Sequence, residues 1–310
     1  MRIQFIAATV VATLGIYPIV AAAQDAYPTK PITIINPNAP GGIVDIVARA
    51  LATFLQKPLK QPVIVVNRPG AGSAIGNAVV ANAAPDGYTV LLASPALAAL
   101  PAIDELFGTQ PLFKLEQLIP IAQITSDPTV IVAHPMIGTK NAAEFIARAK
   151  AKPNDIVISS SGTYGATHLP MVMLEMATGS KFRHVATSGG GPAMTMTLGG
   201  HSQAVASAPG IAYPQVQSGK LVAIAQTGGR RFAPFNDLPT LKESGIDVEY
   251  YIWTGLFAPA KTPAAVLKTF TDAVRQVVQD PEFRAAIGKS NANLAYLDGA
   301  EYQAVFEREA

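Results

Sequence analysis

Four short loops rich in glycine, serine, threonine and proline contain the residues best suited to bind a small molecule. They cover residues 38–45, 94–97, 159–168 and 187–192, and each lies between an apolar segment and a segment with helical spacing. The first turn of a helix has unpaired backbone N–H groups and carries the positive end of the helix dipole. Because small residues let an anion approach these groups closely, the pattern predicts a bound anion such as a carboxylate.

Each loop by itself has a simpler explanation. Gly41 and Gly42 could only shape a turn, Asp45 could only favour the start of its own helix, and residues 161–165 could form an ordinary capped turn. One helix N-terminus contributes about 0.3–2 kcal/mol to a bound negative group. Two or three converging N-termini could therefore hold a carboxylate without arginine or lysine, and four similar loops favour that interpretation.

Other binding and catalytic motifs are incomplete in this sequence. Gly70, Gly72 and Gly76 resemble a dinucleotide-binding motif, but the spacing is one residue too long and no acidic residue follows the next predicted strand. There is no P-loop and no G-x-S-x-G nucleophile motif. The four histidines are far apart and cysteine is absent, so we predict no catalytic residue, no metal site and no cofactor. His168 is expected to orient or hydrogen-bond a neighbouring group rather than to act as a base.

The composition indicates a globular chain of about two domains. The chain has 310 residues, and charged residues make up 14% of it, below the usual share of about 25%. The formal net charge is +2, and the longest basic run is Arg230-Arg231. We therefore expect neither a nucleic-acid partner nor a polybasic membrane patch.

The N-terminus is typical of a secretory signal peptide. Arg2 is followed by an almost wholly apolar stretch over residues 3–20, and residues 21–23 (AAA) offer a cleavage site of small residues. We expect residues 1–23 to be removed near Ala23 and the mature protein to be exported. The alternative is a membrane anchor, for which the apolar stretch is marginal, since a span needs about 20 residues.

The remaining sequence alternates strand-like and helix-like segments, as in α/β folds with largely parallel sheets. Predicted strands cover residues 31–35, 62–66, 88–93, 119–125, 129–133, 156–159, 182–185, 204–206, 221–226 and 251–257. Predicted helices cover residues 43–55, 74–84, 141–151 (with Thr139 as N-cap), 168–177, 192–198 and 263–278. Residues 95–120 are interpreted as a proline-broken stretch.

Because the alternation of the first third is repeated in the middle third, we predict two lobes. Lobe 1 comprises residues 24–125 plus 251–310, and lobe 2 comprises residues 126–250.

Several longer segments together point to a known family. They include NRPGAGSAIGNAVVANAAPDGYT, SSSGTYGATHL, GGGPAMTMTLGG and DLPTLKESG. From about Tyr27 onward the chain resembles the extracytoplasmic solute receptors of tripartite tricarboxylate transporters, the Bug family. The resemblance implies a two-lobed periplasmic binding protein of the type II-like clamshell class, each lobe a mostly parallel sheet flanked by helices. It also implies a carboxylate held in the cleft, largely by loop backbone and ordered water.

The resemblance further implies which residues contact the ligand. In lobe 1 these are Asn38, Ala39, Pro40, Gly41, Gly42, Asp45 and Ser94. In lobe 2 they are Ser161, Gly162, Thr163, Tyr164, Gly165, Ala166, Thr167, His168, Thr187, Ser188, Gly189 and Ser207.

The chain departs from the family pattern at two places that bear on the ligand. Thr187 and Ser188 stand where members usually have tyrosine and lysine, and Ser207 stands where many have an aspartate that can pair with a ligand amine. We therefore disfavour an amino acid and favour a dicarboxylate or a carboxylate with an uncharged tail. Loss of the larger tyrosine could widen the pocket for an aromatic acid, with Tyr164 supplying a ring face.

These observations leave three functional hypotheses. The leading one is a monomeric periplasmic receptor that captures a small organic carboxylate, with a di- or tricarboxylate or an aromatic carboxylate as candidates. It would deliver this ligand to a permease with one small and one large membrane subunit. The second is a receptor that signals to a membrane sensor kinase, which needs the same closure on the ligand. The third is an exported hydrolase, against which the missing nucleophile motif argues.

Overall fold

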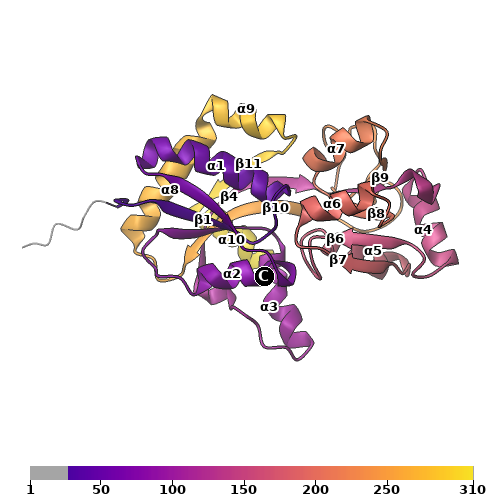
Figure 1. Cartoon of the computed structure of the whole chain (residues 1–310), viewed down its shortest axis with the longest axis horizontal. Coiled ribbons are helices and arrows are strands. Elements are labelled where there is room, and N and C mark those ends of the chain that lie inside the picture. Colours follow the sequence, from indigo (N-terminus) through magenta and orange to yellow (C-terminus); the bar gives the residue numbers. More distant parts are fainter. Residues whose placement is uncertain (1–26, 310) are drawn as a thin grey trace, which may run out of the picture.

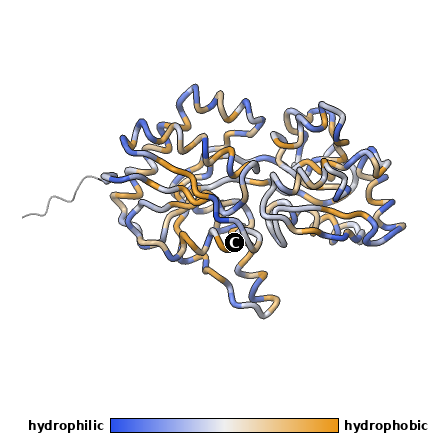
Figure 2. The backbone as a smooth tube through the Cα atoms, viewed as in Figure 1, coloured by the Kyte–Doolittle hydropathy of each residue, from blue (hydrophilic) through white to orange (hydrophobic). Residues whose placement is uncertain are grey.

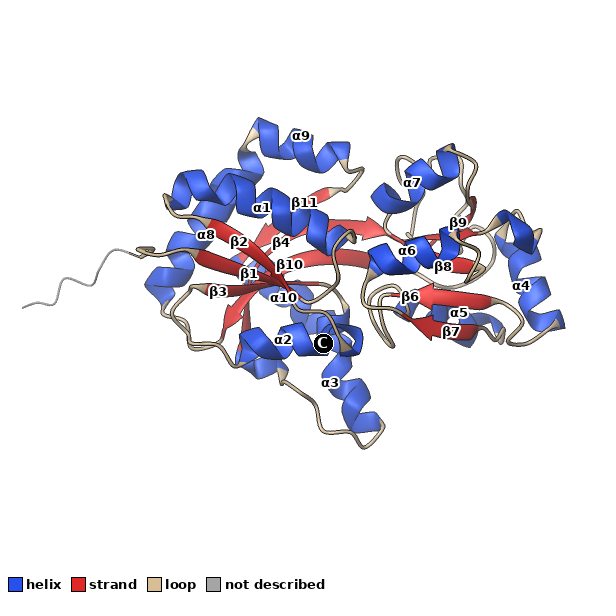
Figure 3. Ribbon diagram, in the orientation of Figure 1, coloured by secondary structure: helices blue, strands red, loops and turns tan. Residues whose placement is uncertain are grey.

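The computed structural model describes residues 27–309, so the predicted signal peptide, residues 1–23, lies outside the described residues. The chain forms two α/β lobes side by side (Figure 1), each with helices on both faces of its own sheet (Figure 3). We call the lobe with the six-stranded sheet lobe 1 and the lobe with the five-stranded sheet lobe 2. The predicted two-lobed α/β fold is confirmed. Within residues 27–309, none of the helices is both long and apolar enough to cross a bilayer.

The sheet of lobe 1 is parallel at one edge and antiparallel at the other. Its strands follow the order β11-β4-β10-β3-β1-β2. β1 pairs in parallel with β2 and β3, because a helix carries the chain back between successive strands. β10 arrives from lobe 2 and therefore pairs antiparallel with both β3 and β4. The strands are β1 (Ile32–Asn36), β2 (Val63–Asn67), β3 (Thr89–Ala93), β4 (Leu118–Pro128), β10 (Tyr251–Pro259) and β11 (Leu294–Asp298).

Two apolar layers cover this sheet. In α1, Val47, Leu51 and Leu55 are spaced four residues apart, so they fall on one face and are fully buried. Figure 2 shows hydrophobic residues concentrated along the central strands of lobe 1. One face is covered by α1 (Ile43–Leu59), α8 (Ala264–Gln279) and α9 (Pro281–Lys289), and the other by α2 (Ala74–Ala81), α3 (Ala96–Leu106) and α10 (Gly299–Glu309).

Lobe 2 repeats this design on a smaller scale. Its strand order is β7-β6-β8-β5-β9, with β6 parallel to β7 and β8, and β5 antiparallel to β8 and β9. The strands are β5 (Val130–Ala133), β6 (Val157–Ser160), β7 (Arg183–Ala186), β8 (Ala204–Ser207) and β9 (Val222–Gln226). Helices α4 (Ala142–Ala151) and α5 (Leu169–Thr178) pack on one face, and α6 (Gly190–Leu198) and α7 (Pro209–Gln217) on the other.

Two segments connect the lobes, and buried threonines tie them together. β4 continues through Thr129 into β5, and the chain returns through Tyr250 into β10. The Thr129 N–H donates to the Thr227 hydroxyl at 2.9 Å. The Thr227 N–H donates to the Thr129 carbonyl, also at 2.9 Å. The Thr227 hydroxyl also donates to the carbonyl of Tyr250 at 2.6 Å. The passage between the lobes is therefore a defined, hydrogen-bonded structure.

The sequence analysis missed α3, α7, α9, β11 and α10. We interpreted residues 95–120 as a proline-broken stretch, but α3 continues through Pro101, and α7 begins with Pro209 and contains Pro214. Proline at the first position of a helix, as in α7, is tolerated because that N–H would have no intrahelical acceptor. α9 also begins with proline and is preceded by Asp280, whose carboxylate accepts the Glu282 N–H at 2.8 Å.

The prediction of Thr139 as an N-cap is wrong. α4 begins at Ala142, and the side chain of Asn141 accepts the N–H of Glu144 at 2.9 Å. Glu144 in turn accepts the backbone N–H of Lys140 at 2.8 Å. Asparagine caps at least as well as threonine, and the glutamate three residues later reinforces the cap.

Replacing Thr227 by valine is expected to destabilise the connection between the lobes. Valine has nearly the same shape but leaves the buried Thr129 N–H without its hydroxyl acceptor, which costs about 1–3 kcal/mol. We expect urea unfolding to show a loss of this size. Thr53→Val is the matched control, since the Thr53 hydroxyl lies on an exposed helix surface and bonds only within its own helix. Equal loss in both variants would contradict the prediction.

Candidate ligand-binding site

A cavity between the two lobes is the candidate ligand-binding site, with about 370 Å³ of space between its lining atoms, part of which is open to solvent. Both lobes contribute to its walls, which explains why residues distant in sequence meet there. From lobe 1 it is lined by Asn38, Gly42, Ile43, Val44, Ser94 and Ile252, and from lobe 2 by Ser161, Ala166, Thr167, Gly190, Ser207, Ala208 and Ile211.

Three helices begin at this cavity. The N-cap residues are Gly42 for α1, Gly189 for α6 and Ala208 for α7. In these three described helices, no N-cap side chain accepts a hydrogen bond from the first turn. The starts of α1 and α6 face each other closely, since a methyl group added at Gly42 would lie 3.5 Å from the backbone nitrogen of Gly190. The starts of α1 and α6 therefore bring unpaired N–H groups and positive dipole ends to the cavity. The first turn of α7 supplies no N–H to it, because Pro209 has none, Gly210 is not among the lining residues, and the Ile211 N–H donates to the Ala208 carbonyl at 3.1 Å.

None of the described residues that line the cavity has a charged side chain. Hydroxyl and amide groups come from Asn38, Ser94, Ser161, Thr167 and Ser207. The remaining wall is formed by aliphatic side chains, namely Ile43, Val44, Ile211 and Ile252. The chemistry suits a ligand with one small anionic group and an apolar body. Within residues 27–309 no three His, Cys, Asp or Glu side chains are grouped so that they could hold a metal ion.

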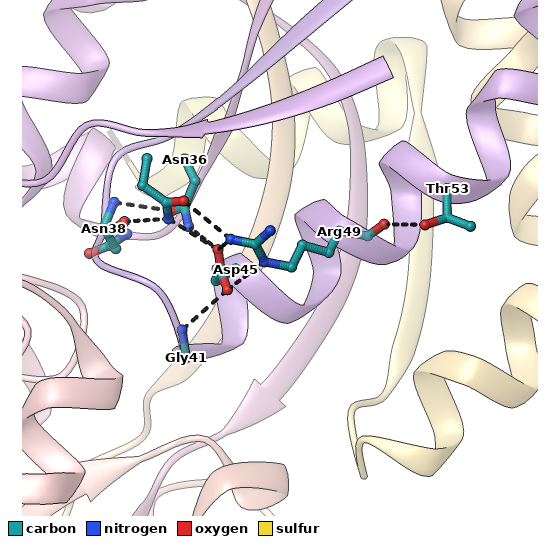
Figure 4. Close-up of polar contacts among 7 residues, drawn as sticks. Asn36, Asn38, Gly41, Asp45, Arg49 and Thr53 are labelled. Carbon is teal, nitrogen blue, oxygen red and sulfur yellow. Dashed lines mark hydrogen bonds and ion pairs between the residues drawn. The ribbon is translucent and has the colours of Figure 1, made fainter. Parts of the chain in front are cut away.

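Asp45, predicted as a ligand contact, is not among the residues that line the cavity. It supports the loop before α1 (Figure 4). Its carboxylate accepts the Gly41 N–H at 3.2 Å and both Nε and Nη2 of Arg49, at 2.9 and 3.0 Å. Burial would raise the pKa of Asp45, but hydrogen bonds from Arg49, Asn67 and Gly41 outweigh it and lower the pKa. The carboxylate is therefore charged and fixes the turn that presents Gly41 and Gly42.

Two asparagines complete this support. The Asn36 side chain accepts the backbone N–H of Asn38 at 3.0 Å and donates to Asp45 at 3.3 Å. Asn67, at the end of β2, donates to the Asn38 carbonyl at 2.9 Å and to Asp45 at 3.0 Å. The loop thus keeps its shape through side chains that face away from the cavity. Neither Asn36 nor Asn67 was predicted, although each is the last residue of a strand that ends beside the loop.

In lobe 2, Ser161 and Thr167 close the loop between β6 and α5. The Ser161 N–H donates to the Thr167 hydroxyl at 2.8 Å, and the two hydroxyls are 3.2 Å apart. This arrangement places both residues in the cavity wall. The ring of Tyr164, which we expected to face the ligand, instead stacks on Phe107 of lobe 1 with ring centroids 5.9 Å apart.

His168 forms a hydrogen bond within its own loop, as a group that orients a neighbour would. Its Nδ1 accepts the Tyr164 N–H at 2.9 Å, and its ring stacks on His184 with centroids 3.6 Å apart. Burial, and to a lesser extent the neighbouring His184, lower the pKa of His168 to about 4. His168 therefore stays uncharged at neutral pH and holds the loop around Tyr164.

The backbones of the two lobes touch around the cavity, so the structure is a closed form. The Ala39 N–H donates to the Ser188 carbonyl across the gap at 2.8 Å. A methyl group added at Gly191 would lie 2.6 Å from the Pro40 carbonyl oxygen, and one added at Gly162 would lie 2.6 Å from the Cα of Gly72. Glycine is required at these positions because the opposite backbone occupies the space of a side chain.

The structure thus divides the predicted site residues into two groups. Those that line the cavity are Asn38, Gly42, Ser94, Ser161, Ala166, Thr167 and Ser207. Those that shape the loops or the contact between lobes are Ala39, Pro40, Gly41, Asp45, Gly162, Thr163, Tyr164, Gly165, His168, Thr187, Ser188 and Gly189. Ile43, Val44 and Gly190 also line the cavity; they lie in two of the predicted loops but were not predicted as contacts. Sequence reasoning missed Ala208, Ile211 and Ile252 altogether, because these look like ordinary core residues in the sequence.

Comparison with known proteins relates the chain to one family. The model for the tripartite tricarboxylate transporter family receptor matches residues 47–309. BugT of Bordetella pertussis is 34% identical over 272 residues, which cover 87% of this chain and 82% of BugT.

Solved structures agree with this result. The periplasmic binding protein BugD has a TM-score of 0.84 at 30% identity, covering 91% of this chain and 95% of BugD. MatC of Rhodopseudomonas palustris, solved with bound malate, has a TM-score of 0.83 at 25% identity, covering 91% of this chain and 97% of MatC. These structures have the same two-lobed fold.

Replacing His168 by asparagine is expected to reduce the acid sensitivity of the protein. In the folded state the pKa of His168 is about 4, whereas in an unfolded chain it is about 6.5. The unfolded chain therefore binds a proton first as the pH falls, so this residue lowers stability progressively from about pH 6.5 to pH 4, by up to about 3 kcal/mol. Asparagine can still accept the Tyr164 N–H but does not titrate.

Urea unfolding at pH 7, 5.5 and 4 measures this effect. We expect the unfolding free energy of His168→Asn to fall less steeply with pH than that of the unaltered protein. Parallel pH profiles for the two proteins would show that His168 is not the group responsible.

Proposed function

Since the chain belongs to the family of tripartite tricarboxylate transporter receptors, we propose that it captures a small organic carboxylate in the cavity between its lobes. It delivers this ligand to a permease of the same transporter class, which has one small and one large membrane subunit. The family consists of solute-binding receptors rather than enzymes, so no bond in the ligand is made or broken. The receptor works as a monomer in the periplasm after removal of residues 1–23.

One observation carries this proposal: the N-termini of α1 and α6 face each other at a cavity in which no described lining side chain is charged. Each N-terminus contributes about 0.3–2 kcal/mol toward a bound negative group. α1 belongs to lobe 1 and α6 to lobe 2. A carboxylate between them bridges the lobes and stabilises the closed form more than the open one.

Closure in this proposal is a rotation of one lobe against the other. The predicted boundaries, near residues 125/126 and 250/251, lie close to the hydrogen bonds between Thr129 and Thr227, where the chain passes from one lobe to the other. Rotation about these segments would separate Ala39 from Ser188 and Gly72 from Gly162, and so open the cavity. The permease then recognises the closed, loaded form.

Ser207 and the cavity wall narrow the ligand class. Ser207 lines the cavity and provides a hydroxyl but no negative charge, so the ammonium group of an amino acid would be buried without a partner, which is unfavourable. MatC, a similar protein, was solved with malate, a carboxylate without an amine. We therefore expect a carboxylate that lacks a cationic group.

Calorimetry with a panel of mono-, di- and tricarboxylates tests the proposal directly. At least one acid of the panel should bind with a 1:1 stoichiometry. The matching amino acid should bind at least about tenfold more weakly, a difference of about 1.4 kcal/mol, because its ammonium group would be buried without a partner. If no carboxylate binds the mature protein, the proposed function is wrong.

Replacing Gly191 by alanine is expected to weaken binding by preventing full closure. Its methyl group would lie 2.6 Å from the Pro40 carbonyl oxygen and 3.0 Å from the carbonyl carbon of Gly41, both in the opposite lobe. We expect the affinity for the best ligand to fall at least about tenfold, while the thermal stability of the ligand-free protein changes little.

Gly288→Ala is the matched control, because the structure shows no atom within 4 Å of the added methyl group. Its affinity should equal that of the unaltered protein. Unchanged affinity in Gly191→Ala would mean that ligand binding does not need the closed contact between lobes.

A further inference from the structure

A second hollow adjoins the ligand cavity on the outside of the molecule. This outer groove is bounded by Pro40 of lobe 1 and by Met194, Leu198 and Gln215 of lobe 2. The space between its lining atoms, including the part open to solvent, is about 1300 Å³, whereas the same measure for the cavity is about 370 Å³. Both hollows contain residues of both lobes, so both take their shape in the closed form.

Among the residues that the structure describes, Ile211 is the one that lines both hollows. The neighbouring glycines divide between them: Gly42 and Gly190 line the cavity, while Gly41 and Gly191 line the outer groove. Glycines of the same two loops thus line both hollows, and Ile211 is the side chain that the hollows share. A substitution at Ile211 can shorten this shared side chain without changing the backbone.

The position of Ile211 keeps its side chain in place. It lies in the first turn of α7, where its N–H donates to the Ala208 carbonyl at 3.1 Å. Its side chain is half-buried and packs against the apolar cores of both lobes. A side chain held in this way can act as a fixed end wall for a ligand.

The chemistry of the cavity indicates which end of a ligand reaches Ile211. The anionic group belongs with the N–H groups at the starts of α1 and α6, where charge is stabilised. Ile211 in α7 and Ile252 in β10 offer no hydrogen-bond donors from their side chains, so the part of the ligand that meets these two residues is apolar. A second carboxylate placed there would lose its hydration without a partner.

We propose that Ile211 is a specificity-determining residue that sets the maximum length of an apolar ligand tail by closing the cavity off from the outer groove. This inference rests on the proposed function, since it assumes that a carboxylate occupies the cavity. It makes the preferred ligand a monocarboxylate with a short apolar tail. Shortening the side chain at this position joins the two hollows and admits longer acids.

Calorimetry with straight-chain saturated monocarboxylates, from acetate to decanoate, tests this inference on the mature protein. Affinity should rise about fourfold for each methylene that is buried and then fall sharply once the tail reaches Ile211. Ile211→Ala removes three carbon atoms, so we expect its longest well-bound acid to be about two or three carbons longer. Ile211→Val removes one carbon atom and should shift the limit by about one, which keeps the test open if the alanine variant does not fold.

Gln215→Ala is the control, because Gln215 lines the outer groove but not the cavity. It should keep the length limit of the unaltered protein. The matched series of α,ω-dicarboxylates should bind more weakly than monocarboxylates of equal length.

Each outcome is decisive. If short monocarboxylates bind but the length limit is the same with isoleucine, valine and alanine at position 211, the role of Ile211 is refuted and the proposed function stands. If dicarboxylates bind more tightly than monocarboxylates of equal length, the inference that the ligand has an apolar tail is refuted. If no acid of any length or type binds the unaltered protein, the proposed function itself fails.

Discussion

The structure depends on direct contact between backbones of opposite lobes, with no side chain in between. Gly191 meets Pro40 and Gly162 meets Gly72 at distances that exclude even a methyl group. These contacts bring the start of α1 against the start of α6, which neither lobe could achieve alone. The proposed anion site is therefore a property of the closed pair of lobes. In that proposal, a carboxylate between the helix N-termini stabilises the contact, and the contact in turn removes water from the carboxylate.

Much of the polar chemistry near the site serves to hold the loops rather than to touch the ligand. Asp45 is fully occupied by Arg49, Asn67, Asn36 and Gly41, and His168 is kept neutral with its Nδ1 on the Tyr164 backbone. A loop that presents backbone N–H groups must keep its shape in the open form, when no ligand orders it. Side chains behind the loop provide this rigidity, and they leave the front free for the ligand.

The sequence was sufficient to predict the two lobes, most strands and the four loops, because these follow from local patterns. Alternation of apolar strands and helical segments is repeated twice, and glycine and serine mark each strand end. It was insufficient for α3, because Pro101 lies inside this helix, where proline usually ends one, and for α7, which begins with Pro209 and contains Pro214. It was also insufficient for the apolar wall of the cavity. Ile211 and Ile252 have the residue type of core positions, and only the packing of one lobe on the other turns them toward a ligand. Asp45 was predicted as a ligand contact for the related reason that a sequence does not tell which side of a loop a carboxylate faces.

A site made of helix dipoles suits a receptor that must release its ligand. A buried ion pair with arginine or lysine would bind a carboxylate strongly in both the open and the closed form, because the charge stays with the side chain. In the proposed mechanism the N-termini of α1 and α6 meet only when the lobes are closed, so the stabilisation of the carboxylate is divided as soon as α1 moves away from α6. Opening the lobes therefore weakens binding by itself, and a partner that favours the open form releases the ligand without competing for it.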